Sequence, residues 1–280
     1  MTAVSGDPEV GSVIDVGGVH TNVHDVLAAA DDAGVPVLLL HGSGPGVSAW
    51  ANWRGVIPAL SKRRRVIAPD IVGFGYTPAP AGFVFSRENW VAHVVDLLDT
   101  LGVQKVAVVG NSFGGALALW LAHAHPDRVE RMVLMGSVGV PFLITEGLDT
   151  VWGYTPSVER MEEVMGFFAY DRSRITPELV QLRYEASIRP GVAEAFSAMF
   201  PEPRQTGVDA LSLPYADIEA IAQPTLVLHG RDDRVIPLEA SLRLHELLPT
   251  SELHVFGRCG HWVQIEAGDR FVNVVEGFLG

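Results

Sequence analysis

The chain has 280 residues, of which 48% are hydrophobic, and its mean hydropathy is +0.24. This apolar content can offset the entropy of ordering the chain, which argues against an intrinsically disordered protein. The formal net charge of −13 and the sequence pI of about 5.1 disfavour nucleic-acid binding, because an acidic surface repels phosphate backbones.

Three further features bear on where the protein works. Cys259 is the single cysteine, so no disulfide can form within the chain. The first residues lack the basic start and apolar run of a secretory signal. No apolar run reaches the roughly 18 to 20 residues that a membrane span needs. We therefore expect a cytoplasmic protein that does not associate with membranes.

Short apolar runs alternate with longer amphipathic ones along the chain. Residues 13–26 alternate apolar and polar side chains around Gly17-Gly18, which predicts a β-hairpin. Runs typical of buried strands follow at residues 35–40, 66–69, 106–109, 132–135 and 225–228. Helical spacing predicts one helix that aligns Trp50, Trp53, Ile57 and Leu60, and another over residues 90–101. The alternation predicts an α/β fold with a mostly parallel, twisted sheet flanked by helices.

One segment lacks any buried-strand pattern. Residues 142–207 contain helical stretches, such as 159–168 and 178–187, separated by prolines. An all-helical insertion in a parallel sheet is typical of a lid over the carboxyl edge of the strands, where ligands bind in such folds. The sequence therefore predicts a core of residues 1–141 and 208–280, with residues 142–207 as an inserted helical lid.

The strongest chemical signal is a G-x-S-x-G motif centred on Ser112. Residues 110–114, Gly-Asn-Ser-Phe-Gly, lie between a strand-like run and a helix-like run. In that context the motif is a nucleophile elbow, a tight turn that exposes the serine and marks the α/β-hydrolase fold. The glycines are required because a side chain would clash in so tight a turn. We predict that Ser112 is the nucleophile.

A serine hydroxyl needs a base, and the base needs an acid to orient it. In this fold the chain order is serine, acid, histidine. His261 lies in a glycine-rich loop after the strand-like run LHVF, and Asp233 follows the run TLVLHG. Asp232 is adjacent, but the spacing to Val235 and Pro237 favours Asp233. The alternative interpretation is that Asp233 caps a helix near Pro237 and that His261 is an ordinary loop residue.

The turn at residues 41–46, His-Gly-Ser-Gly-Pro-Gly, follows a predicted strand. Such a turn can present backbone N–H groups to an oxyanion, together with the N–H of Phe113, although it is also compatible with a purely structural turn. The sequence has no H-E-x-x-H or C-x-x-C spacing, no phosphate-binding loop and no dinucleotide-binding motif. These patterns predict a hydrolase that uses neither a metal nor an organic cofactor.

Several stretches together resemble one family. They are residues 41–46, 49–53, 110–115, 145–149, 182–190 and 257–262. In these stretches the chain resembles the meta-cleavage product hydrolases, the carbon–carbon bond hydrolases of aromatic degradation. The resemblance is greatest to the branch that acts on monocyclic ring-fission products such as 2-hydroxymuconic semialdehyde.

The resemblance implies a role for each matching position. Ser112, Asp233 and His261 match the catalytic triad, and Gly42 or Ser43 with Phe113 would supply the oxyanion-hole N–H groups. The substrate-binding positions implied are Asn52, Asn111, Arg183, Phe168 and Trp262. Arg183 would hold the carboxylate and enol oxygen of a small anionic dienoate. Without the resemblance, Arg183 could equally be a solvated arginine on a helix surface. In a chain this acidic, a lone cation over a pocket would give an anion its bidentate partner.

The implied reaction cleaves a 2-hydroxy-6-oxohexa-2,4-dienoate into 2-hydroxypenta-2,4-dienoate and a small carboxylic acid. The alternatives are a carboxylesterase of the same fold and a ligand-binding module on a hydrolase scaffold. A dehalogenase or an epoxide hydrolase is disfavoured, because the enzymes of this fold with those activities resemble one another in having aspartate at the elbow, where this chain has Ser112. The sequence leaves open the acid released (formate, acetate, isobutyrate or benzoate), covalent attack by Ser112 against activation of water, and the oligomeric state, a homo-oligomer being possible. Pocket size would be set near Phe142, Ile144, Trp152 and Ile236.

Overall fold

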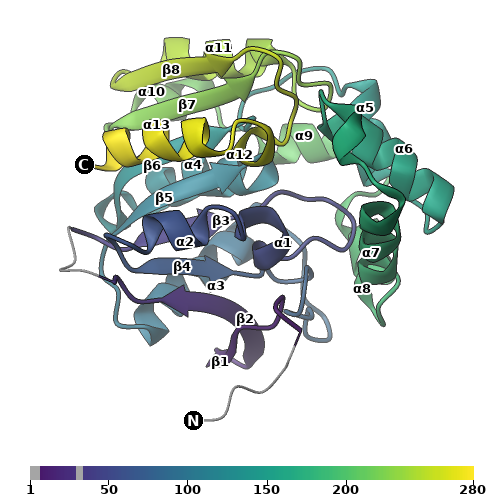
Figure 1. Ribbon diagram of the computed structural model, residues 1–280. Helices are drawn as coiled ribbons and strands as arrows, with labels where there is room; N and C mark the ends of the chain where they lie inside the picture. The colour runs from purple at the N-terminus through teal and green to yellow at the C-terminus, as the bar shows by residue number, and fades with distance from the viewer. Residues whose placement is uncertain (1–6, 30–33) are drawn as a thin grey trace.

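The computed structural model describes residues 7–29 and 34–280, and one sheet runs through this part of the chain (Figure 1). Its strand order is β1-β2-β4-β3-β5-β6-β7-β8. The strands are β1 Ser12–Val16, β2 Val19–Val26, β3 Val37–Leu40, β4 Val66–Pro69, β5 Val106–Asn111, β6 Val129–Met135, β7 Thr225–Gly230 and β8 Ser251–Phe256. Pairing is antiparallel from β1 through β2 to β4 and parallel from β4 to β8. The predicted α/β fold with a mostly parallel sheet is confirmed.

Helices cover both faces of the sheet. They are α1 Ala49–Trp53, α2 Ile57–Leu60, α3 Arg87–Thr100, α4 Phe113–Ala124, α5 Glu146–Trp152, α6 Val158–Phe168, α7 Pro177–Ser187, α8 Val192–Met199, α9 Gln205–Leu211, α10 Tyr215–Glu219, α11 Leu238–Leu247, α12 Val263–Glu266 and α13 Asp269–Leu279. In the described part of the chain, no helix is long and apolar enough to cross a membrane.

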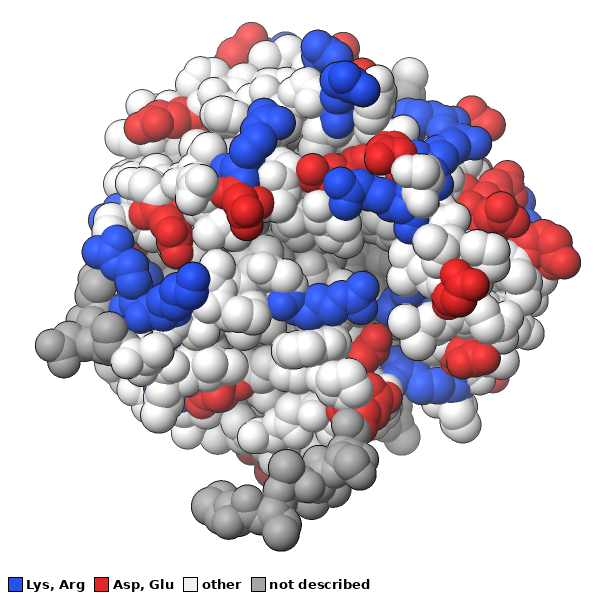
Figure 2. All heavy atoms as spheres, viewed as in Figure 1, with Lys and Arg blue, Asp and Glu red and all other residues white. Residues whose placement is uncertain are grey.

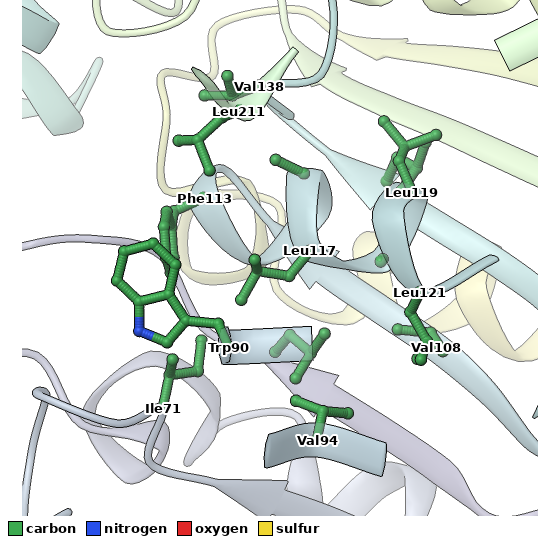
Figure 3. Close-up of a cluster of buried hydrophobic side chains, with 14 of the residues drawn as sticks. Ile71, Trp90, Val94, Val108, Phe113, Leu117, Leu119, Leu121, Val138 and Leu211 are labelled. Carbon is green, nitrogen blue, oxygen red and sulfur yellow. The ribbon is translucent and has the colours of Figure 1, made fainter. Parts of the chain in front are cut away.

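The central strands are apolar throughout because both of their faces are buried. In β3, Leu38 and Leu40 belong to the core cluster under α3 and α4, whereas Leu39 belongs to the cluster under α1, α2 and α13. Figure 3 shows the first cluster, in which Trp90 and Phe113 lie close together beside Leu117. Such two-sided burial explains why these strands could be recognised as short, continuous apolar runs.

The prediction of a single helix that aligns Trp50 with Leu60 is wrong, because the structure has two short helices there. Helix α1 ends at Trp53 and α2 begins at Ile57. Pro58 is the second residue of α2, and a proline ring clashes with the carbonyl four residues earlier, here that of Arg54. The chain therefore turns after α1, which leaves Asn52 and Arg54 beside the carboxyl edge of the sheet.

Helices α5 to α10 occupy the connection between β6 and β7, and α5 to α8 lie within the stretch for which the absence of strand patterns predicted helices. In Figure 1, α5 to α8 gather at one side of the sheet. The boundary predicted at residue 207 falls inside α9, so the helical segment continues to Leu211. The division into a core and a lid stays a prediction.

Candidate active site

Ser112 sits in a strained turn between β5 and α4. Its backbone has φ 55 and ψ −113, a conformation that is costly for any residue with a side chain. A Cβ atom on Gly110 would lie 2.5 Å from the Gly114 carbonyl oxygen, and one on Gly114 would lie 2.3 Å from that of Leu40. The G-x-S-x-G spacing thus reflects two close backbone approaches, and the turn has the strand–turn–helix context of a nucleophile elbow.

Asp233 and His261 meet at the ends of β7 and β8. His261 Nδ1 donates a hydrogen bond of 2.7 Å to Asp233 Oδ2, and Asp233 Oδ1 accepts from the N–H groups of Val235 (2.7 Å) and Ile236 (3.0 Å). Burial raises the pKa of Asp233, but the attraction and hydrogen bond of His261 outweigh it and leave that pKa below its usual value. The carboxylate therefore stays charged and fixes the proton of His261 on Nδ1, which leaves Nε2 free to act as a base.

The structure also bears on Asp232 and on the alternative that Asp233 caps a helix. Asp232 Oδ2 faces the N–H of Cys259 at 3.3 Å and does not pair with His261. Helix α11 begins at Leu238 with Pro237 at its N-cap, so the bonds of Asp233 hold the preceding loop rather than the helix end.

One cavity brings most of the predicted site residues together. Ser112 and His261 line it, and so do Gly42, Ser43, Asn52, Asn111, Phe168, Arg183 and Trp262. Asp233 lies behind His261, and the side chain of Phe113 points into the core (Figure 3). Figure 2 shows the hollowed surface, with Lys or Arg side chains at its edge. Among the described residues, no group of three His, Cys, Asp or Glu side chains is placed to hold a metal ion.

The turn after β3 is held rigidly beside Ser112. Burial lowers the pKa of His41 to about 4, so its ring is neutral. His41 Nδ1 donates to the Gly42 carbonyl (2.8 Å), and Nε2 accepts from the Ile71 N–H (2.9 Å). Gly42 N–H is directed at Asn52 Oδ1 at 3.4 Å. Within the described ranges the N–H groups of Ser43 and Phe113 have no acceptor, which leaves both available to an oxyanion.

Arg183, on α7, faces the cavity from a buried position. Its side chain is 13% exposed, pairs with Glu9 at 3.5 Å and donates to the Gly46 carbonyl. The solvated-surface interpretation of this arginine is therefore wrong. The expectation of a lone cation is also wrong, because Arg54 and Arg174 line the same cavity. No spacing in the sequence indicated these two arginines, although Arg54 directly follows the stretch 49–53.

Comparison with known proteins places this geometry in a family. The model described as alpha/beta hydrolase fold matches residues 35–268. The 2-hydroxy-6-oxo-2,4-heptadienoate hydrolase of Pseudomonas putida is 59% identical over 97% of this chain and 96% of its own. The 2-hydroxymuconate semialdehyde hydrolase of Pseudomonas sp. (strain CF600) is 53% identical over 100% and 97%. A solved meta-cleavage product hydrolase from Pseudomonas fluorescens IP01 has a TM-score of 0.95 and 55% identity, over 98% of each chain.

The chain belongs to the meta-cleavage product hydrolases. The resemblance predicted from the sequence is thereby confirmed, together with the α/β-hydrolase fold.

In this meta-cleavage product hydrolase an aromatic stack joins α6 to the histidine loop. The ring of Phe168 stacks on His261 (centroids 5.8 Å apart) and on Trp262 (5.3 Å). The carbonyl of Phe168 also accepts from the N–H groups of His261 (2.8 Å) and Trp262 (3.2 Å). These contacts make a flat apolar wall against which a conjugated, planar ligand can lie.

The apolar wall of the cavity agrees with the expectation in part, since Val151 beside Trp152 and Val235 beside Ile236 line it, whereas no residue of the stretch 142–147 does. In the described chain, Phe142, Ile144, Trp152 and Ile236 do not line the cavity of this hydrolase. Its apolar lining comes from Val47, Leu148, Val151, Met161, Met165, Phe168, Leu179, Val235, Trp262 and Ile265. On α5 the cavity side carries Leu148 and Val151, while Trp152 stacks on Phe200 (4.4 Å) and donates from Nε1 to Ser43 Oγ (2.9 Å). The neighbour of Ile236, rather than Ile236 itself, reaches the cavity.

Proposed function

We propose that this protein hydrolyses the carbon–carbon bond of a 2-hydroxy-6-oxohexa-2,4-dienoate, either 2-hydroxymuconic semialdehyde or a 6-alkyl analogue. Water adds across the bond, giving 2-hydroxypenta-2,4-dienoate and a small carboxylic acid. The names of relatives at 53% to 59% identity confirm the carbon–carbon bond hydrolase activity expected from the sequence.

The observation that carries this assignment is the composition of one cavity. Ser112 and His261 share it with a buried cation, Arg183, and with two asparagines, Asn52 and Asn111. A carboxylesterase needs the serine and the histidine but has no use for a buried arginine facing its substrate. Hydrolysis of a dienoate needs the serine and the histidine for the reaction and also a cation for the substrate carboxylate, which a planar guanidinium can bind with two parallel hydrogen bonds.

The proposed reaction begins with ketonisation of the bound dienol. Arg183, Asn52 and Asn111 hold the carboxylate and enol oxygen, while Phe168 and Trp262 pack on the conjugated chain. His261, oriented by Asp233, moves a proton from the enol oxygen to the carbon chain, which creates an electron sink beside the scissile bond.

Hydrolysis follows at the distal carbonyl. The hydroxyl of Ser112, or a water molecule that it activates, attacks this carbon, and the N–H groups of Ser43 and Phe113 stabilise the oxyanion. Each such donor contributes roughly 3 kcal/mol in other enzymes. When the carbon–carbon bond breaks, its electron pair enters the conjugated system and regenerates the dienol after proton transfer. If a water molecule attacked, the acid is released at this step; if Ser112 attacked, the acyl group is left as an ester on Ser112, and water then hydrolyses this ester to release the acid and the free hydroxyl.

The first experiment follows the loss of yellow dienolate absorbance with the ring-fission products of catechol, 3-methylcatechol and 2,3-dihydroxybiphenyl. A p-nitrophenyl ester is assayed in parallel. We expect rapid bleaching with the first two, and loss of this activity in Ser112→Ala. Ester hydrolysis with all three dienolates untouched would indicate a carboxylesterase, and binding without turnover of any substrate would indicate a ligand-binding module.

Two properties stay predictions. A cytoplasmic location is checked by cell fractionation, and a homo-oligomer by light scattering of the purified protein.

A further inference from the structure

Glu9 lies before β1 and contacts the cation of the site. Its side chain is 11% exposed, and Oε1 is 3.5 Å from Arg183 Nη1. The other oxygen, Oε2, accepts a hydrogen bond of 2.8 Å from the hydroxyl of Ser48. A carboxylate far from Arg183 in the chain, and belonging to no sequence motif, thus approaches the residue expected to bind the substrate.

The position of Glu9 is set by the sheet. Its carbonyl oxygen accepts from Asn22 Nδ2 (3.0 Å) and from His24 Nε2 (3.2 Å), both in β2. Its N–H donates to Asp7 Oδ1 at 2.9 Å. Because the backbone is fixed on both sides of the residue, the side chain is presented from a rigid base.

Glu9 connects three elements that border the cavity. Ser48, its hydrogen-bond donor, also caps α1 by accepting from the Ala51 N–H at 3.1 Å, and α1 carries Asn52. Arg183 on α7 donates to the carbonyl of Gly46, two residues before Ser48. The carboxylate therefore lies where the turn after β3, helix α1 and helix α7 meet.

Glu9 also offsets part of the cost of burying the Arg183 charge. Burial lowers the pKa of Arg183, and the attraction of Glu9 is the largest opposing cause. Arg189 and Arg54 are nearby like charges that lower it further. A long arginine side chain loses about 2 kcal/mol of rotamer entropy when it is fixed, so contacts that fix it before the substrate arrives reduce the entropy cost of binding.

We propose that Glu9 is a positioning residue that fixes Arg183 for the substrate carboxylate and couples helix α7 to α1. The proposal rests on the proposed function only in assuming that Arg183 binds a carboxylate. The opposing hypothesis is that Glu9 competes with the substrate for Arg183. The two hypotheses predict changes of opposite sign when the charge of Glu9 is removed.

The test compares Glu9→Gln with a matched control, Glu185→Gln, which makes the same chemical change at an exposed position. Glutamine keeps the size of Glu9 and still accepts from Ser48, but it no longer pairs with Arg183. Glu185 lies on α7 like Arg183, is exposed and accepts a hydrogen bond from Gln181, which a glutamine there can still accept. KM and kcat are measured for the catechol ring-fission product, which carries a carboxylate, and for p-nitrophenyl acetate, which does not.

We expect Glu9→Gln to raise KM for the dienoate about tenfold, equivalent to ~1.4 kcal/mol, with kcat/KM for the ester changed by less than about twofold. Glu185→Gln should leave the kinetics of both substrates unchanged. Ser48→Ala, which removes the bond to Oε2 but keeps both charges, should shift KM in the same direction by a smaller factor.

An unchanged or lower KM in Glu9→Gln would overturn the proposal, the lower value favouring competition. Equal losses on dienoate and ester would also overturn it, because they would indicate a general structural role.

The same variants separate this proposal from the proposed function. If the unmodified protein bleaches no dienolate, hexa-2,4-dienoate is used as an inhibitor of ester hydrolysis. An inhibition constant that rises about tenfold in Glu9→Gln supports the role of Glu9 even though the substrate assignment has failed. An inhibition constant equal in both proteins, or the absence of inhibition, rejects it.

Discussion

Asp233→Asn tests the assignment of acid and base most directly, because the structure dictates how the new amide must lie. The side chain of Asp233 is 1% exposed, and its Oδ1 accepts from the N–H groups of Val235 and Ile236. An amide has a single oxygen. If its NH₂ faced these two donors, both would be buried without an acceptor, at a cost of about 1–3 kcal/mol each. The oxygen therefore stays on that side, and the NH₂ turns toward His261.

This orientation inverts the hydrogen bond that holds His261. The NH₂ donates to Nδ1, so the ring carries its proton on Nε2 and cannot take another at neutral pH without becoming a cation that has no carboxylate partner. A triad that loses its acid in this way loses roughly 10⁴-fold in kcat, as measured in a serine protease. That factor corresponds to ~5.5 kcal/mol of activation free energy. The fold should be little affected, since the volume and the two backbone bonds are kept.

The assay measures kcat for the catechol ring-fission product in Asp233→Asn and in Asp232→Asn. The second variant changes the adjacent carboxylate, which faces the N–H of Cys259 instead of His261. Circular dichroism and thermal melting verify that both variants fold. We expect a large loss of kcat in Asp233→Asn alone. Turnover within about tenfold of the unmodified protein, or an equal loss in Asp232→Asn, would refute the reasoning.

Two of three further predictions concern the surroundings of the site, and the third concerns His93, a buried histidine of α3. Trp152→Phe removes the donor to Ser43 Oγ, and we expect unfolding in urea to show about 1 kcal/mol lower stability and kcat to fall a fewfold as the oxyanion turn loosens. Val235→Ala widens the cavity and should favour larger acyl groups. We expect the ratio of kcat/KM for the biphenyl-derived substrate to that for the catechol-derived substrate to rise by a factor equivalent to about 1–3 kcal/mol of activation free energy. Burial lowers the pKa of His93 to about 4, against ~6.5 when unfolded, so the unfolded state binds the extra proton and stability falls as the pH drops through this window. His93→Gln should therefore reduce the loss of unfolding free energy between pH 7 and pH 4.5 by about 2–3 kcal/mol, and an unchanged loss would contradict the assignment.

The parts of the site that the sequence predicted are those fixed by local constraints. The G-x-S-x-G turn was recognisable because Gly110 and Gly114 are demanded by backbone contacts within a few residues or with the adjacent strand. The positions of Asp233 and His261 followed from chain order and from the ends of two apolar strands. The break between α1 and α2 was also readable in principle, since Pro58 alone prevents a continuous helix.

The cavity wall could not be predicted in the same way. Whether Leu148 or Trp152 faces the cavity depends on how α5 is rotated against Phe200 and the turn after β3, which no local pattern records. The same holds for Arg54, the residue that ends α1 and lines the cavity. These contacts arise from packing between elements far apart in the sequence. Helical periodicity predicts which face of a helix is buried, but it does not predict which other element packs against that face.

The contacts of Phe168 bear on the idea of a separate lid. Its carbonyl accepts from the N–H groups of His261 and Trp262, and its ring stacks on both side chains. If α6 moved away by more than the length of a hydrogen bond, both bonds would break and the histidine loop would lose its support. The end of α6 therefore helps to hold His261, the residue that we propose as the base. Any opening of the cavity that keeps these contacts has to come from the other helices of the segment, with α6 held in place.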